Sequence, residues 1–234
     1  MNDSKAHFHQ TTLFPLAVLL SASAIGVGLS ELQRARTHNH LYALLPGNLF
    51  LAWLPLVFAL GVFYLHRRGE RRSWRLGALA ALWLLFFPNA PYIFTDLVHM
   101  PTVWWGSAFW VDLSVVLLVA LTGFVVGFVS LYLMQRVVTE RLGKVAGWLF
   151  IFMVAWLSGF GVYLGRVLRR NSWDVVTHPL ALTQSIGHVA AHPFTDRTSL
   201  VFSTVFATFL FLGYLMLYAL THLQAVPREQ AQVV

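Results

Sequence analysis

The chain has 234 residues, of which 58% are hydrophobic and only 11% are charged. A soluble globular domain would carry about 25% charged residues, so this class is excluded. The formal net charge of +7 does not indicate nucleic-acid binding, because the basic residues cluster in short loops between apolar runs. Cysteine is absent, which excludes disulfides, a thiolate nucleophile and a cysteine-ligated metal. We therefore predict an all-α polytopic transmembrane helical bundle in a lipid bilayer, with no nucleic-acid partner.

Six apolar stretches are long enough to cross a bilayer, which takes about 20 residues. In chain order they are residues 13–29, 46–65, 74–94, 108–134, 146–165 and 200–220. The chain shows no internal repeat, soluble domain or low-complexity linker, so we expect a single membrane domain over residues 1–234. Three glycine pairs with small-xxx-small spacing allow helices to approach closely; they are Gly123…Gly127, Gly143…Gly147 and Gly161…Gly165. We expect packing within one chain rather than dimerisation, and the oligomeric state stays open.

Lysine and arginine counts predict the orientation of these spans. Ten of the basic residues fall in the N-terminal segment, the second and fourth loops and the C-terminal tail, and six fall in the other loops. The second loop alone holds Arg67, Arg68, Arg71, Arg72 and Arg75, whereas the third loop holds none. Because cytoplasmic loops carry an excess of basic residues, we expect both termini in the cytoplasm.

The third span ends in a segment unlike the rest of the chain. Pro88 and Pro91 break the helix there and free backbone groups that lipid cannot satisfy. Counted from Trp74, Pro88 lies about 21 Å along the helix, in the outer part of a core about 30 Å thick. The polar residues that follow are Asn89, Tyr92, Asp96 and His99. A carboxylate at a membrane boundary is costly without a partner or a task, so any site should include this segment.

A second unusual segment follows the fifth span, on the same predicted outer side. It contains Arg166, Arg169, Arg170, Asn171, Trp173 and Asp174. The three arginines share one face if the helix continues, and guanidinium suits both carboxylate and phosphate. The two outer loops can therefore form a structural ion pair, or a ligand or catalytic site, unless they do not meet. For Asp112, at the start of the fourth span, we expect an arginine partner or a helix-capping role.

Two strings in these segments resemble a known family. They are Pro88-Asn89-Ala90-Pro91-Tyr92 with Thr95-Asp96-Leu97, and Gly165-Arg166 with Asn171-Ser172-Trp173-Asp174. The chain is similar, over most of its length, to bacterial predicted membrane proteins known as domain of unknown function thirteen sixty-one. This resemblance implies an integral protein of the bacterial cytoplasmic (inner) membrane, and it implies no activity.

The last outer loop contains His188 and His192, spaced at i and i+4. This spacing occurs in zinc sites, but the glutamate of the zinc-protease pattern is missing, so these residues are only weak metal candidates. The apolar stripe between Pro179 and Pro193 instead predicts a short amphipathic helix lying in the membrane interface, with the histidines on its wet face.

The binding residues that we predict lie at the outward-facing mouth of the bundle. They are Asn89, Tyr92, Asp96, His99, Asp112, Arg166, Arg169, Asn171, Trp173 and Asp174. In this hypothesis Arg166 and Arg169 hold an anionic group such as a lipid headgroup phosphate, and Asp96 acts as a base or counter-ion. No cofactor is predicted, since the chain has no glycine-rich phosphate loop and no haem-type histidine pair in facing spans.

Three functions remain open at this stage. The first is an enzyme or binder acting on an anionic lipid or lipid-linked substrate. The second is a structural or assembly subunit of a membrane complex. A small-solute transporter is a weaker third, because few polar residues lie at mid-membrane.

Overall fold

The computed structural model describes residues 3–38, 40–70, 74–99, 107–166, 180, 187 and 197–222. Its elements are α1 (Asp3–Thr37), α2 (His40–Arg67), α3 (Trp74–Phe86), α4 (Asn89–Tyr92), the 3-10 helix η1 (Ile93–His99), α5 (Ser107–Leu142), α6 (Lys144–Arg166) and α9 (Arg197–His222). No strand occurs among these residues, so the predicted all-α bundle is confirmed. The interfacial helix predicted in the last outer loop falls outside them.

Six helical stretches are long and apolar enough to cross a membrane, as expected from the sequence. They are Phe14–Thr37, His40–Arg67, Trp74–Leu97, Phe109–Leu142, Lys144–Arg166 and Ser199–Thr221. Several helices run well past the apolar stretches, and α5 alone has 36 residues. At 1.5 Å per residue it is about 54 Å long, so it extends beyond a hydrocarbon core of about 30 Å.

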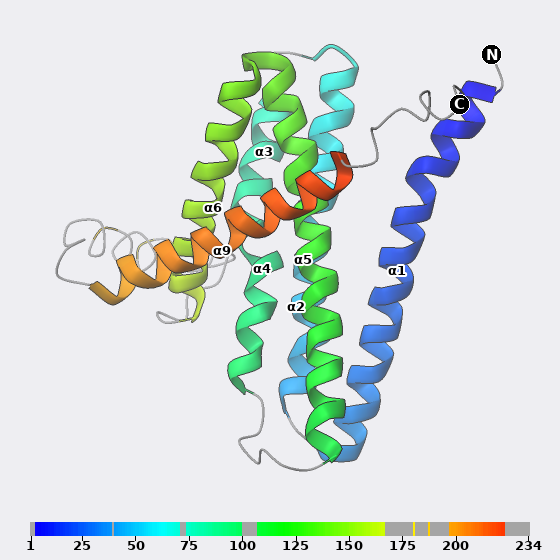
Figure 1. Cartoon of the computed structure of the whole chain (residues 1–234), viewed down its shortest axis with the longest axis vertical. Helices are drawn as coiled ribbons and strands as arrows, with labels where there is room; N and C mark the ends of the chain where they lie inside the picture. Colours follow the sequence, from blue (N-terminus) through cyan, green and yellow to red (C-terminus); the bar gives the residue numbers. More distant parts are fainter. Residues whose placement is uncertain are drawn as a thin grey trace, which may run out of the picture.

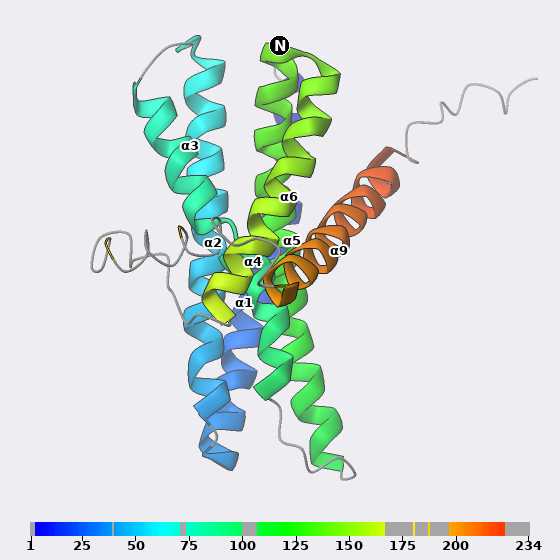
Figure 2. The ribbon, with the colours of Figure 1, turned by 90° about the vertical axis from the view of Figure 1, so that its left-hand side faces the viewer.

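The helices place the loops at two opposite ends of the molecule. The start of α1, the α2–α3 connection and the α5–α6 turn lie together at one end, the top of Figure 1. We call this the arginine-rich end, after Arg67, Arg68, Arg75, Arg136 and Arg141. At the other end α1 is followed by α2, and η1 and the start of α5 lie beside them. The last span, α9, crosses α5 and α6 obliquely in both ribbon views (Figures 1 and 2).

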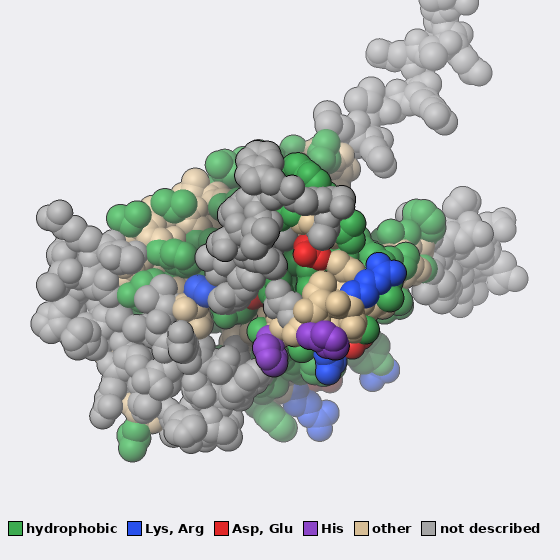
Figure 3. Space-filling model, turned by 90° about the horizontal axis from the view of Figure 1, so that it is seen from below, with side chains coloured by type: hydrophobic (Ala, Val, Ile, Leu, Met, Phe, Trp, Pro, Cys, Tyr) green, Lys and Arg blue, Asp and Glu red, His purple; other side chains and the backbone are tan. Residues whose placement is uncertain are grey.

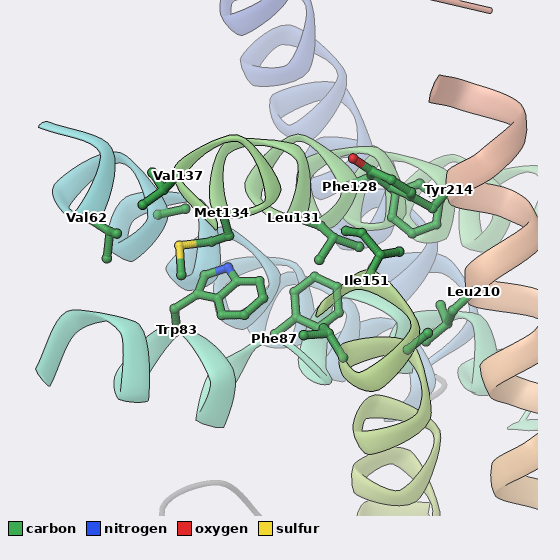
Figure 4. Packing of buried hydrophobic residues seen from close by; sticks show 13 residues of the cluster. Val62, Trp83, Phe87, Phe128, Leu131, Met134, Val137, Ile151, Leu210 and Tyr214 are labelled. Atoms are coloured by element: carbon green, nitrogen blue, oxygen red, sulfur yellow. The ribbon is translucent and has the colours of Figure 1, made fainter. Parts of the chain in front are cut away.

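A compact aromatic core fixes α3 just before the third span breaks. Trp83 is 1% exposed, and its ring centroid lies 5.0 Å from that of Phe87 and 5.7 Å from that of Phe150 on α6. The indole N–H donates a hydrogen bond to Ser130 Oγ on α5 at 3.2 Å, which satisfies the only polar atom of this side chain. Figure 4 shows Trp83 and Phe87 facing Leu131 and Ile151. The break therefore begins from a rigid position.

The third span is discontinuous, as its prolines predict. Helix α3 ends at Phe86, the single turn of α4 follows, and η1 continues as a 3-10 helix. Asn89 Nδ2 donates to the Phe86 carbonyl at 2.9 Å across the break. The usual partner of the Phe86 carbonyl, the Ala90 N–H, bonds the Phe87 carbonyl instead at 3.1 Å, and Phe87 has no donor four residues on because Pro91 lacks an N–H.

Glycines on α5 and α6 make room for the broken segment. A Cβ on Gly127 would lie 2.6 Å from Ala90 Cβ, and one on Gly161 would lie 2.9 Å from Pro88 Cγ. Gly123 is equally close to a side chain of η1. These glycines therefore serve packing inside the chain, which is the interpretation favoured by the sequence.

Candidate functional site

The polar residues at the break converge on one ion pair. Arg166, the last residue of α6, places Nη2 2.7 Å from Asp96 Oδ1 on η1. The side chains are 17% and 3% exposed, respectively, so this is a buried pair with the arginine nearer the surface. The two segments that the sequence analysis singled out therefore meet at this contact.

Three further side chains complete the arrangement. Asn48 Nδ2 on α2 donates to Asp96 Oδ2 at 2.7 Å, so both carboxylate oxygens accept a hydrogen bond. Arg166 Nε donates to Thr95 Oγ1 at 2.9 Å, and its guanidinium carbon lies 4.4 Å from the centroid of the Tyr92 ring. Residues of α2, α4, η1 and α6 thus hold one guanidinium–carboxylate pair in a fixed orientation.

This arrangement satisfies the electrostatic demands of burial. An isolated carboxylate in a low-dielectric region would cost several kcal/mol. Asp96 avoids this cost because it has a charged partner and a neutral amide donor. The aromatic face beneath Arg166 adds a cation–π contact, which strengthens when the cation is partly desolvated.

On two helices the pair lies about the thickness of a bilayer core away from the arginine-rich end. Arg166 comes 22 residues after Lys144 at the start of α6, a rise of about 33 Å. On α2, Asn48 comes 19 residues before Arg67, a rise of about 29 Å. Both values match a hydrocarbon core of about 30 Å. We call this region, formed by Asn48, Tyr92, Thr95, Asp96 and Arg166, the broken end.

Asp112 belongs to a separate polar contact farther along the same end. Its Oδ1 accepts a hydrogen bond from Gln33 Nε2 at 2.5 Å, and the buried Tyr42 hydroxyl lies beside both groups. The expected arginine partner or capping role is wrong, because α5 begins five residues earlier at Ser107 and the described partner is the amide. This contact joins α1, α2 and α5.

The surface at this end is polar as well. Figure 3, which views the molecule from the broken end, shows acidic, basic and histidine side chains gathered on the described part of the face. A hollow of about 440 Å³ at the α1–α2 turn is lined in part by Glu31, Arg34, His38 and His40. Arg34 and Glu31 form an exposed ion pair there at 3.1 Å.

The remaining predicted residues are placed as follows. Asn89 bonds the Phe86 carbonyl beside the pair, and His99 is the last residue of η1, with a side chain that the structure does not describe. Arg169, Asn171, Trp173, Asp174, His188 and His192 lie outside the described residues.

Sequence reasoning did not select Asn48, Thr95, Gln33 or Tyr42 as site residues. Asn48 did carry a signal, since it is a lone amide inside an apolar span. Thr95 stands next to Asp96 in the string that resembles the family, so the same resemblance could have selected it. Gln33 and Tyr42 carry no comparable signal, because their contact depends on how α1 packs against α2.

These features define a multi-pass membrane protein with a discontinuous third span and a buried ion pair at its end. The chain belongs to the family described as Protein of unknown function (DUF1361), which matches residues 48–225. The matched region contains Asn48, Asp96, Asp112 and Arg166, whereas Gln33 and Tyr42 precede it. No curated protein and no solved structure matches the chain.

Proposed function

We propose that this is a multi-pass protein of the bacterial cytoplasmic (inner) membrane that binds or modifies an anionic lipid or lipid-linked substrate. In this proposal both termini lie in the cytoplasm and the broken end faces outward. The observation that carries it is the buried Asp96–Arg166 pair, held by the broken third span at about the distance of a bilayer core from the arginine-rich end.

The energetics of buried pairs support a role beyond stability. Replacing such a pair with apolar residues of similar volume is often neutral or stabilising, so a pair of this kind is weak evidence for a structural purpose. An ionisable residue at membrane depth is by default a functional-site hypothesis. Irregular backbone such as α4 and η1 is also tolerated there only when it is buried in protein or lines a cavity.

The geometry suits recognition of a phosphate by exchange of partners. Tyr92 and Thr95 hold the Arg166 guanidinium in one orientation, and its planar fork fits phosphate as well as carboxylate. A phosphate that takes the place of Asp96 keeps the positive charge neutralised. The displaced carboxylate, still bonded to Asn48, is then available as a base or counter-ion.

The first test compares membrane lipids in a deletion strain and its parent. Re-expression of the wild-type protein should restore the parental lipid profile, whereas Asp96→Asn and Arg166→Gln should not. Arg34→Gln is the matched control, because it removes an exposed arginine with a carboxylate partner from the same end of the molecule. An unchanged lipid profile in the deletion strain would remove the basis for the proposal.

A structural or assembly subunit is the second candidate function. Asp96 is only 2% exposed, and both of its oxygens accept hydrogen bonds. These bonds tie α2 and α6 to η1, as expected for a purely structural contact. The double variant Asp96→Asn with Arg166→Gln separates the two candidates, because it removes the pair without leaving a buried charge. If it folds normally and restores the lipid profile, the pair has no role in lipid binding or modification. Co-purification of a stoichiometric partner would then support the assembly role.

A transporter has one supporting observation, the discontinuous third span, because broken helices form substrate sites in several transporter folds. Uptake of a solute by proteoliposomes containing the purified protein would favour it over both other candidates.

The natural absence of cysteine allows a direct test of sidedness. Arg34→Cys and Lys144→Cys place single thiols at exposed positions on opposite ends of the molecule. With a membrane-impermeant thiol reagent, intact cells should label Arg34→Cys, and Lys144→Cys should react only after permeabilisation. The reverse pattern would place the broken end in the cytoplasm.

A further inference from the structure

A groove of about 480 Å³ lies between α2 and α3 at the arginine-rich end. Figure 2 shows these two helices side by side there, apart from the ribbons of α5 and α6. The groove is far from the Asp96–Arg166 pair along α2, so it is a separate feature of the molecule.

The floor of this groove is formed where α2 and α3 pack closely. Leu79 on α3 fills the space beside Gly61 on α2, since a Cβ on Gly61 would lie 3.0 Å from Leu79 Cδ1. Ala78 on α3 is exposed and adds only a methyl group. The result is an open apolar groove along the surface of two helices, where an acyl chain can lie.

The mouth of the groove is cationic and aromatic. Arg75 lines it and is exposed, and Trp74 and Tyr64 are 78% and 54% exposed. The Arg68 guanidinium lies 4.5 Å from the centroid of the Tyr64 ring, which brings a second cation to the same opening. Tryptophan and tyrosine prefer the depth of the lipid headgroups, and basic pockets between helices bind anionic headgroups.

The described residues around this opening carry charges of both signs. Helix α3 begins at Trp74 and has no acidic residue in its first turn, so the positive end of its dipole also lies at the mouth. On α5, Glu140 is already engaged by Arg136 at 3.1 Å and by His66 at 3.0 Å. Glu70, in the connection between α2 and α3, is the acidic residue nearest in sequence to the two arginines.

We propose that this groove binds one anionic phospholipid from the adjoining leaflet. Its phosphate lies between Arg68 and Arg75, and one acyl chain runs along Ala78 and Leu79. The site is independent of the proposed function at the broken end. On the orientation proposed above, it faces the cytoplasmic leaflet, whose surface is negatively charged.

The test measures thermal unfolding of the purified full-length protein in a neutral detergent. Phosphatidylglycerol and phosphatidylcholine with identical acyl chains are titrated separately, and inorganic phosphate is titrated as a third ligand. We expect phosphatidylglycerol to raise the melting temperature at lower concentration than phosphatidylcholine, and phosphate alone to have no effect. Arg75→Gln should raise the concentration of phosphatidylglycerol for half the effect roughly fivefold, since one arginine near the surface contributes about that factor.

Two further variants separate a site from general surface charge. Ala78→Trp should fill the floor of the groove and abolish the stabilisation, although it keeps both arginines. Lys144→Gln removes an exposed cation at the same end but outside the groove, and it should change the phosphatidylglycerol dependence less than about twofold. Equal effects of the two lipids, equal losses in Arg75→Gln and Lys144→Gln, or full stabilisation of Ala78→Trp would each overturn the proposal.

Discussion

The two ends of the molecule hold their charges in different ways. At the broken end Asp96 and Arg166 are 70 residues apart in the sequence and are buried. At the arginine-rich end Arg136 and Glu140 are one helical turn apart, and their side chains are 44% and 36% exposed. Water can hydrate the second pair, whereas the first depends entirely on the fold. The same type of interaction should therefore have very different energetic weight at the two ends.

The largest effect should come from removing one partner of the buried pair. Arg166→Ala leaves Asp96 buried with only Asn48 as a described partner, and we expect a loss of about 3–5 kcal/mol in unfolding free energy. Reversible unfolding in detergent, followed by helix content, measures this loss.

Two controls sharpen this prediction. Arg166→Lys keeps the charge but loses the planar fork, so it should cost less than the alanine variant. The double variant Asp96→Asn with Arg166→Gln should recover most of the stability, since no buried charge remains. A double variant as unstable as Arg166→Ala would contradict the claim that the unpaired carboxylate causes the loss.

Loss of the hydrogen bond to the other oxygen of Asp96 should lower the stability less. Asn48→Ala removes the neutral donor to Asp96 Oδ2 and leaves the Arg166 contact in place. We expect a loss of about 1.5–3 kcal/mol, the range for hydrogen bonds to charged groups. Asn48→Asp should be worse at neutral pH, because it places two carboxylates in contact, and this difference should shrink in acid. Equal stability of wild type and Asn48→Ala would show that the amide is dispensable.

The position of the broken segment could be predicted from the sequence, because it depends on residues within the segment itself. Pro88 and Pro91 forbid a continuous helix wherever they stand, and an aspartate shortly afterwards needs a partner. The six spans follow from apolar length in the same way. The ion pair itself was one of three open outcomes, because residue spacing alone does not say whether two loops meet.

The partners supplied by packing were not accessible in this way. Asn48 stands out in the sequence, but its bond to Asp96 is seen only when α2 lies beside η1, and the Gln33–Asp112 contact depends on the register of α1 against α5. The length of α5 was also underestimated, since its turns continue past the apolar stretch to Leu142. Hydropathy reports where lipid contacts a helix, and a helix that extends into polar surroundings gives no such signal.

A third prediction concerns the packing of the broken segment against α5 rather than its charges. Gly127→Ala places a methyl group 2.6 Å from Ala90 Cβ, and neither atom belongs to a flexible side chain. We expect a loss of about 1–3 kcal/mol from overpacking. Gly28→Ala is the matched control, because nothing lies within 4 Å of its added Cβ. Alanine has the higher helix propensity, so this factor alone should stabilise both variants. A loss at Gly28 as large as at Gly127 would therefore contradict the close contact as the cause.

The smallest loss of stability should come from the exposed ion pairs at the arginine-rich end. Glu140→Gln removes the carboxylate that contacts Arg136 and His66, but solvent screens both contacts. We expect a loss of about 0–1 kcal/mol, smaller at 0.5 M salt than at 0.05 M. The Arg166→Ala loss should be nearly insensitive to the same change in salt, because that pair is shielded from the solution. If the two variants lost equal stability with equal salt dependence, burial would not distinguish the two ends, and the argument for a special role of the Asp96–Arg166 pair would fail with it.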